Sequence, residues 1–296
     1  MSKRKAEEPK DEPMVDKSDD SQDEDEEIVD VDFDFFDVDP VDFHAVKRLL
    51  GQLFSADAEL LNLTDFSDLI ISQANVGSTV KVDGKESDPY ALLTVINTNV
   101  HKENASVKGV VEYLMSKCPM KDVALRGQVA QVLQPREPNQ GHDAAIVISE
   151  RFLNMPVQIM PPMYKMLMEE MAKTNAANGG FDFEWYVFIS KTYKEVQSTL
   201  DEEGEQLEAP VAPKKKKAKK QAQEMELMYF QSEDEIIAEH ADIQYDFKLT
   251  NADKEASSDA RRAFTDYGIA PGRRVMMVKS SKMKAMIEAL EEACAI

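Results

Sequence analysis

The chain has 296 residues, of which 43% are apolar, enough to build a substantial hydrophobic core. Its formal net charge is −21, and residues 1–42 hold 18 of the 56 acidic side chains but only 5 of the 35 basic ones. Such a field repels nucleic acid and membrane surfaces and attracts basic proteins. The charge therefore disfavours direct binding to nucleic acid or to a membrane.

Few features of the sequence point to a secreted or metal-binding protein. Cys118 and Cys294 are the two cysteines, which cannot build a disulfide framework and do not lie in a metal-type cluster. The first residues, MSKRKAEEPKDEP, lack the apolar stretch of a signal peptide, and no apolar run approaches the roughly 18 residues of a membrane span. We expect a soluble intracellular protein with no cofactor and no metal site.

Residues 1–28 are charged and nearly free of large apolar side chains, so we expect a disordered acidic tail. Seven carboxylates in this tail stand almost without opposing bases: Asp19, Asp20, Asp23, Glu24, Asp25, Glu26 and Glu27. A flexible polyanion resembles the field of a nucleic-acid backbone, so it suits client proteins whose normal partner is RNA or DNA. These residues are therefore the candidate client-binding segment. A tail that serves only solubility is the alternative.

Order should begin at the segment IVDVDFDFF (28–36), where apolar residues alternate with aspartates from residue 29 onward. This period predicts a half-buried strand whose outer face is a row of carboxylates. Charge of this kind protects an edge strand from unwanted pairing. A continuation of the acidic binding surface is compatible with the same pattern.

Helices and strands then alternate along the chain. Asp39 and Pro40 open a helix with an apolar face through residue 54, and Thr64 is positioned to cap a second helix. Strands are expected at 76–82, 90–97, 144–149, 181–193, 243–249 and 274–280, and further helices at 105–117, 121–133, 162–173 and 283–294. The pattern predicts a single α/β domain over 29–296, with a central mixed sheet covered by helices on both faces.

One charged stretch interrupts this order, and we interpret about 198–223 as a flexible insertion. Five acids occur in 201–208, and six lysines follow: Lys214, Lys215, Lys216, Lys217, Lys219 and Lys220. The lysines predict a nuclear localisation signal. A solvated loop that pairs with its own acidic half is the alternative.

The search for catalytic motifs finds none of the common ones. There is no G-x-x-x-x-G-K-[ST], G-x-S-x-G, H-E-x-x-H or C-x-x-C, and the four histidines are scattered. We therefore expect a protein that is not an enzyme and has no catalytic residues.

The methionine-rich stretch IVISERFLNMPVQIMPPMYKMLMEE (146–170) allows two interpretations. Methionine commonly fills gaps in a core, and it also lines adaptable binding surfaces. In the second interpretation, Met155, Met160, Tyr164 and Met168 line a groove for a client protein.

Three segments, ISERFLNMP, DPVDFHAVKRLLGQLF and DPYALLTVIN, resemble signatures of the BCCIP family, and the resemblance covers nearly all of the chain from about residue 31. It implies a nuclear partner-binding protein, with a fold similar to the GCN5-related acetyltransferases but without their activity. It also implies roles in ribosome biogenesis as chaperone of a large-subunit ribosomal protein, in nuclear export of a lipid kinase through the nuclear transport machinery, and in cell-cycle control and DNA repair. The family further implies shuttling between nucleus and cytoplasm.

The residues themselves disfavour acetyltransfer. That chemistry cradles a pyrophosphate on main-chain N–H groups in [QR]-x-x-G-x-[GA], at a strand-to-helix turn. The one near match, residues 48–53, ends in Leu53 and falls inside a predicted helix. The leading hypothesis is a non-enzymatic nuclear chaperone or adaptor for basic clients. The rivals are a divergent acetyltransferase, a general acidic binder of histones that mimics DNA, and a cell-cycle or DNA-repair adaptor.

Overall fold

The computed structural model describes residues 32–73, 75–135, 143–195, 226–252 and 268–294. The acidic segment at 1–28, the insertion at 198–223 and the six lysines at 214–220 lie outside the described residues. From Phe33 onward, the described residues belong to one compact unit.

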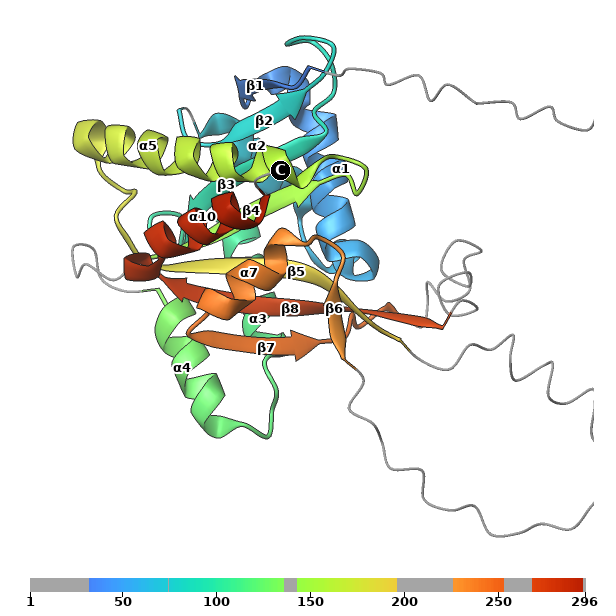
Figure 1. Cartoon of the computed structure of the whole chain (residues 1–296). Helices are drawn as coiled ribbons and strands as arrows, with labels where there is room; N and C mark the ends of the chain where they lie inside the picture. Colours follow the sequence, from blue (N-terminus) through green and yellow to red (C-terminus); the bar gives the residue numbers. More distant parts are fainter. Residues whose placement is uncertain (1–31, 74, 136–142, 196–225, 253–267, 295–296) are drawn as a thin grey trace, which may run out of the picture. The chain divides into compact units, whose positions relative to one another are not determined.

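The centre of this unit is a mixed sheet with strand order β1-β2-β3-β4-β5-β8-β7, and β6 lies beside β5 (Figure 1). The strands are β1 (Asp34–Asp37), β2 (Ser78–Lys81), β3 (Ala91–Asn97), β4 (Asp143–Arg151), β5 (Phe183–Glu195), β6 (Leu227–Tyr229), β7 (Ile243–Phe247) and β8 (Ile269–Lys279). In this described sheet, β4 and β5 run parallel, and every other pair is antiparallel. The predicted α/β class and mixed sheet are confirmed.

Apolar patterning explains the position of each strand. Every residue of β3 is buried, and β4 is buried over most of its length, as expected for strands covered on both faces. At one end of the sheet, β7 alternates buried and exposed residues. At the other end, β1 exposes Asp34 and Asp37 and half-buries the two phenylalanines between them. The predicted edge strand is thus present at 34–37, and the part predicted before residue 32 lies outside the described residues.

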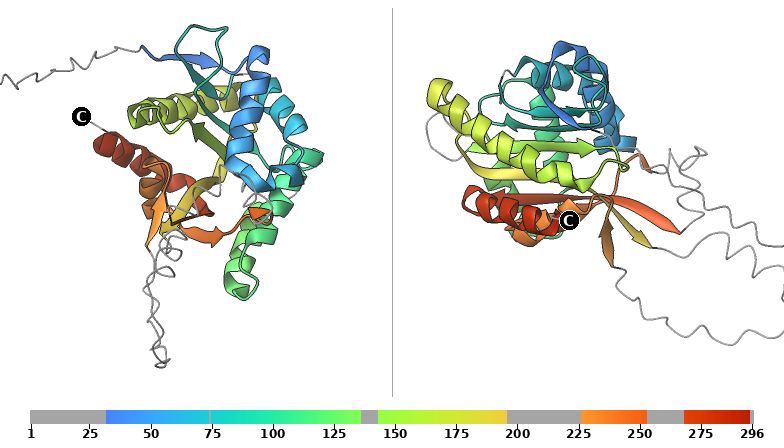
Figure 2. Two further views of the ribbon diagram at one scale, coloured as in Figure 1. Left: turned by 90° about the vertical axis from the view of Figure 1, so that its right-hand side faces the viewer. Right: turned by 45° about the horizontal axis from the view of Figure 1, so that its top comes forward.

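Helices cover both faces of the sheet (Figures 1 and 2). On one face lie α1 (Phe43–Phe54), α2 (Leu63–Ser72), α3 (Ala105–Lys117) and α4 (Val123–Leu133), and on the other lie α5 (Met160–Asn178), α7 (Glu233–His240) and α10 (Ser280–Cys294). Each layer contributes one apolar cluster with the strand residues that point to it. The central strands of the sheet are therefore buried on both faces.

The start of α1 follows the predicted capping chemistry. Asp39 and Asp42 form a reciprocal capping box around one 3-10 turn (Pro40–Asp42), and α1 continues from that turn. The cap predicted for α2 is wrong. Asn62 caps this helix, because its side-chain oxygen accepts a hydrogen bond from the N–H of Asp65 at 3.2 Å. Thr64 lies within the first turn, and its hydroxyl accepts a hydrogen bond from the ammonium of Lys47 on α1.

Candidate functional site

The side chains proposed to line a groove in the methionine-rich segment lie mostly inside the core. Met155, Met160 and Tyr164 are 5%, 1% and 0% exposed and lie in the cluster between α5 and the sheet, with Met168 half-buried beside them. The Tyr164 hydroxyl donates to Ser149 Oγ at 3.3 Å. Met155, Met160 and Tyr164 are thus enclosed by the core and cannot contact a client as the groove interpretation requires, whereas Met168 is only partly enclosed. Their role is to pack α5 on the sheet.

A polar interior opens where β4 leaves β5. The two strands pair from Asp143 and Phe183 to Val147 and Phe188 and then separate. Beyond that point β5 pairs with β6, and α7 follows β6 into the gap. Polar side chains from β4, β5, α7 and the loop before α7 gather in this gap, all of them buried except Lys191, which is 11% exposed: Glu150, Arg151, Ser190, Lys191, Gln231, Glu233 and Asp234.

Arg151 joins the end of β4 to α7. Its Nε and Nη2 donate to the two carboxylate oxygens of Glu233, both at 2.7 Å, and Nη1 donates to the Met155 carbonyl at 2.8 Å. Gln231 donates to the Arg151 carbonyl at 3.2 Å. A bidentate pair of this kind fixes distance and orientation together, so α7 closes the gap in one geometry.

Two further carboxyl groups lie in this gap. Glu150 is 1% exposed and accepts Lys191 Nζ at 2.5 Å on Oε2, while its Oε1 has no hydrogen-bond partner among the described residues. Burial raises the pKa of Glu150. Asp234 accepts the Ser190 hydroxyl at 2.5 Å, and burial together with the Glu233 charge raises the pKa of Asp234 to about 8. Both shifts favour the protonated form of the carboxyl groups in this gap.

A pocket of about 590 Å³ adjoins these groups, where the loop after β4 faces the ends of β5, β8 and α1. Its lining comprises Gln52, Ser55, Arg151, Phe152, Leu153, Asn154, Lys191, Phe230, Pro271 and Arg273. Arg273 is committed to main-chain carbonyls, including that of Leu53 at 2.7 Å. The polar groups of this pocket thus stabilise the junction of four elements.

These residues do not fit a coenzyme A pyrophosphate. The strand-to-helix turn between β4 and α5 contains no glycine, and α5 begins with Pro161 and Pro162, which have no N–H to offer an anion. The near match at 48–53 lies inside α1, as the helical period predicted. The gap between the diverging strands is also occupied by the side chains that α7 brings in.

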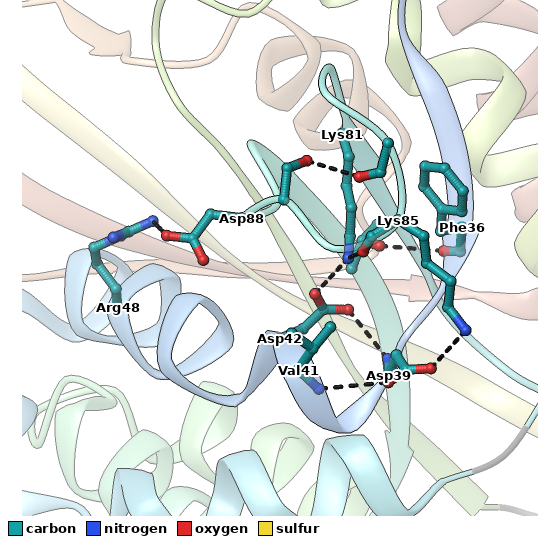
Figure 3. A network of polar contacts seen from close by, with 11 residues as sticks. Phe36, Asp39, Val41, Asp42, Arg48, Lys81, Lys85 and Asp88 are labelled. Carbon is teal, nitrogen blue, oxygen red and sulfur yellow. Dashed lines mark hydrogen bonds and ion pairs between the residues drawn. The ribbon is translucent and has the colours of Figure 1, made fainter.

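A second polar network lies at the edge of the sheet formed by β1 and β2 (Figure 3). Lys81 on β2 is completely buried; its Nζ donates to Asp42 Oδ1 at 2.6 Å and to the Lys85 carbonyl at 2.5 Å, and lies 5.7 Å from the centre of the Phe36 ring. Asp39 pairs with Lys85 at 2.9 Å on the surface above. The network ties β1, the turn before α1 and the loop after β2 to one buried cation.

This fixed end of the sheet is also acidic. Asp34 and Asp37 are exposed on β1, and Asp32 is exposed just before it. In the sequence these residues follow directly on the acidic segment at 1–28. They are the described part of the predicted acidic binding surface.

Sequence reasoning did not anticipate β6 or α7, although α7 supplies Glu233 and Asp234 to the polar gap. A signal was present, because three acids after Ser232 and a histidine at residue 240 match the charge preference of a short helix. No periodic apolar stripe of useful length accompanies it. The partnership between Arg151 and Glu233, 82 residues apart, has no local signature.

Comparison with known proteins identifies the class. The BCCIP family model matches residues 28–237. The chain is 40% identical to Protein bcp1 of Aspergillus oryzae, covering 92% of this chain and 90% of that protein, and 40% identical to Protein bcp1 of Schizosaccharomyces pombe, covering 99% of both. The crystal structure of BCP1 from Saccharomyces cerevisiae matches with a TM-score of 0.58 at 24% identity over 93% of both chains, which shows a shared fold.

These matches support a nuclear partner-binding protein built on a mixed α/β sheet. The chain belongs to the BCCIP family, so the resemblance carried by its motifs is confirmed. In the part of the chain that the structure describes, no helix is long and apolar enough to span a membrane. Within the same residues, no group of three or more His, Cys, Asp or Glu side chains could hold a metal ion.

The buried Lys81 should be the most sensitive position at the β1 end. Lys81→Met leaves Asp42 buried without its cation and should lower the free energy of unfolding by about 3–5 kcal/mol in urea titrations. Lys85→Met is the control, because it breaks an ion pair at the surface and should have a much smaller effect. Equal losses from the two substitutions would contradict the anchoring role of Lys81.

Asp234 should make stability depend on pH. Because the folded pKa of about 8 lies above the usual 3.8, the folded chain keeps a proton that the unfolded chain releases between these values. Stability therefore falls as pH rises from 4 to 8, by at most about 1.4 kcal/mol per pH unit. Asp234→Asn should reduce this slope in urea unfolding from pH 5 to 9, whereas Glu239→Gln, an exposed change on the same helix, should keep it. Parallel curves for wild type and Asp234→Asn would exclude a raised pKa.

Proposed function

We propose that this protein is a non-enzymatic nuclear chaperone or adaptor that binds basic client proteins through its acidic N-terminal part. The observation that carries the proposal is the continuity of negative charge from the acidic segment at 1–28 into the exposed aspartates of β1. A concentration of charge of one sign speeds encounter with an oppositely charged partner. The folded domain would then supply contacts that are specific in shape.

The client we propose is a basic protein of the large ribosomal subunit, and the process is ribosome biogenesis. Membership in the BCCIP family supports this choice, because the family resemblance implies such a chaperone. The same resemblance supports export of protein cargo, including a lipid kinase, through the nuclear transport machinery. The six lysines at 214–220 would supply nuclear entry, and the protein would shuttle to the cytoplasm.

The sheet topology supports the likeness to GCN5-related acetyltransferases, since β4 and β5 are parallel neighbours that then separate. Against acetyltransfer stand the two prolines at the start of α5 and the α7 side chains in the gap. Saturable binding in a titration with acetyl-coenzyme A would revive the enzyme. A general acidic binder would release its client to polylysine of equal charge, whereas a dedicated chaperone would retain it.

Deleting residues 1–28 should slow client capture. At low salt the association rate with a basic large-subunit ribosomal protein should fall about tenfold, and its salt dependence should flatten, because the long-range attraction is lost. Stopped-flow fluorescence measures both quantities. A chain whose residues 1–28 are shuffled should associate as fast as wild type. Equal rates with and without the segment at low salt would reject its role.

Replacing the six lysines at 214–220 by serine should reduce nuclear accumulation. The basic cluster is what a nuclear import receptor reads, so the variant should spread into the cytoplasm when imaged as a fluorescent fusion. Replacing the five acids at 201–208 by serine is the control for the neighbouring charges and should leave localisation unchanged. Lys3, Arg4 and Lys5 form a second, smaller basic cluster that could substitute for the lysines. Unchanged nuclear accumulation of a variant with serine at these three positions and at the six lysines would exclude import directed by basic clusters.

A further inference from the structure

The free edge of β1 offers main-chain groups in addition to charge. β1 is the last strand at one end of the sheet (Figure 1). The main-chain groups of successive strand residues face opposite edges. On β2, the carbonyl of Val80 accepts the N–H of Tyr90 at 2.8 Å on the β3 side. Thr79 and Lys81, the neighbours of Val80 on β2, therefore direct their main-chain N–H and C=O groups toward β1.

The register then fixes which residues of β1 face outward. Phe36 lies opposite Thr79, whose hydroxyl donates to the Phe36 carbonyl at 3.3 Å, and Asp34 lies opposite Lys81. The main-chain N–H and C=O groups of Phe36 and Asp34 therefore face β2. Phe35 and Asp37 consequently direct their N–H and C=O groups away from the sheet. Among the described residues, none makes a hydrogen bond to these outward groups. The edge is open for a further strand.

This edge is preorganised. Phe33 and Phe35 pack against the core cluster between the sheet and α5. The buried ammonium of Lys81 holds the loop after β2 and the turn that follows β1. A partner strand would thus meet a surface that is already ordered. Preorganisation lowers the entropy cost that association otherwise carries.

The exposed charges select the partner. Asp34 and Asp37 project to opposite faces of the strand, so an added strand would lie between carboxylates on both faces. Opposite charges across neighbouring strands stabilise pairing, and like charges oppose it. A second copy of β1 would bring aspartates beside aspartates. A strand rich in lysine or arginine would bring cations there.

We propose that the free edge of β1 binds an extended, lysine- and arginine-rich segment of a client as an added strand. The inference rests on the proposed function in taking a basic client, and adds where and how part of it binds. Strand addition of this kind takes affinity from main-chain hydrogen bonds and specificity from the alternating side chains. Here a client strand that alternates cations with other residues would place its cations beside Asp34 or beside Asp37, according to its register.

Asp37 allows charge and N–H to be separated. Asp37→Asn removes the charge only, whereas Asp37→Pro removes the charge and the outward N–H and keeps the inner ladder between β1 and β2. The probe is a labelled peptide that alternates lysine with valine, titrated by fluorescence anisotropy against the full chain. Asp37→Asn should weaken binding about threefold, and Asp37→Pro should weaken it tenfold or more. Glu239→Gln on α7 should leave binding unchanged.

Two readouts keep the test independent of how well the proline variant folds. A peptide alternating lysine with proline has equal charge but cannot form a regular ladder, so it should bind wild type at least tenfold more weakly. Hydrogen exchange of residues 33–37 should slow only with the lysine–valine peptide. Equal affinity for both peptides, or unchanged exchange in a saturated complex, would overturn strand addition while leaving basic-client binding intact. Failure of the proposed function appears separately, as absence of binding to the ribosomal protein itself.

Discussion

The buried ion pair between Lys81 and Asp42 determines how the acidic end of the sheet is held. An ammonium removed from water is costly unless its charge and its donors are satisfied. Here a carboxylate, a main-chain carbonyl and the face of the Phe36 ring surround it. These partners come from the turn before α1, the loop after β2 and β1. A single arrangement of three segments satisfies the ammonium, so the edge strand has a defined position.

The polar gap between β4 and β5 solves a different problem. Two strands that separate leave main-chain and side-chain groups without partners, and α7 supplies those partners from a distant part of the chain. The carboxyl groups in the gap are oriented by neighbours on several elements and have little access to solvent. Their arrangement stabilises a junction, whereas the acidic edge faces outward. Both networks thus bury charges that stabilise the fold, whereas Asp34 and Asp37 remain exposed on β1.

Much of the fold could be predicted because its signals are local. The apolar run at 144–148 and the alternation over 243–249 predicted the strands observed as β4 and β7. The capping pair at Asp39 and Pro40 marked the start of the first helical segment. Thr64 was mistaken for a cap because Asn62, two residues earlier, provides the same chemistry. For Met155, Met160 and Tyr164, composition alone could not decide between core and groove, since both uses suit methionine.

The sequence by itself determined the sign and location of the charge, the order of most helices and strands, and the family. These depend on composition, on periods of two and 3.6 residues, and on motifs, all of which are read within short windows. Tertiary structure decided which acids are buried and which are exposed. Asp42 and Asp34 look alike in sequence, yet one neutralises a buried lysine and the other faces solvent. Burial depends on elements far apart in the chain, so no local pattern could distinguish them.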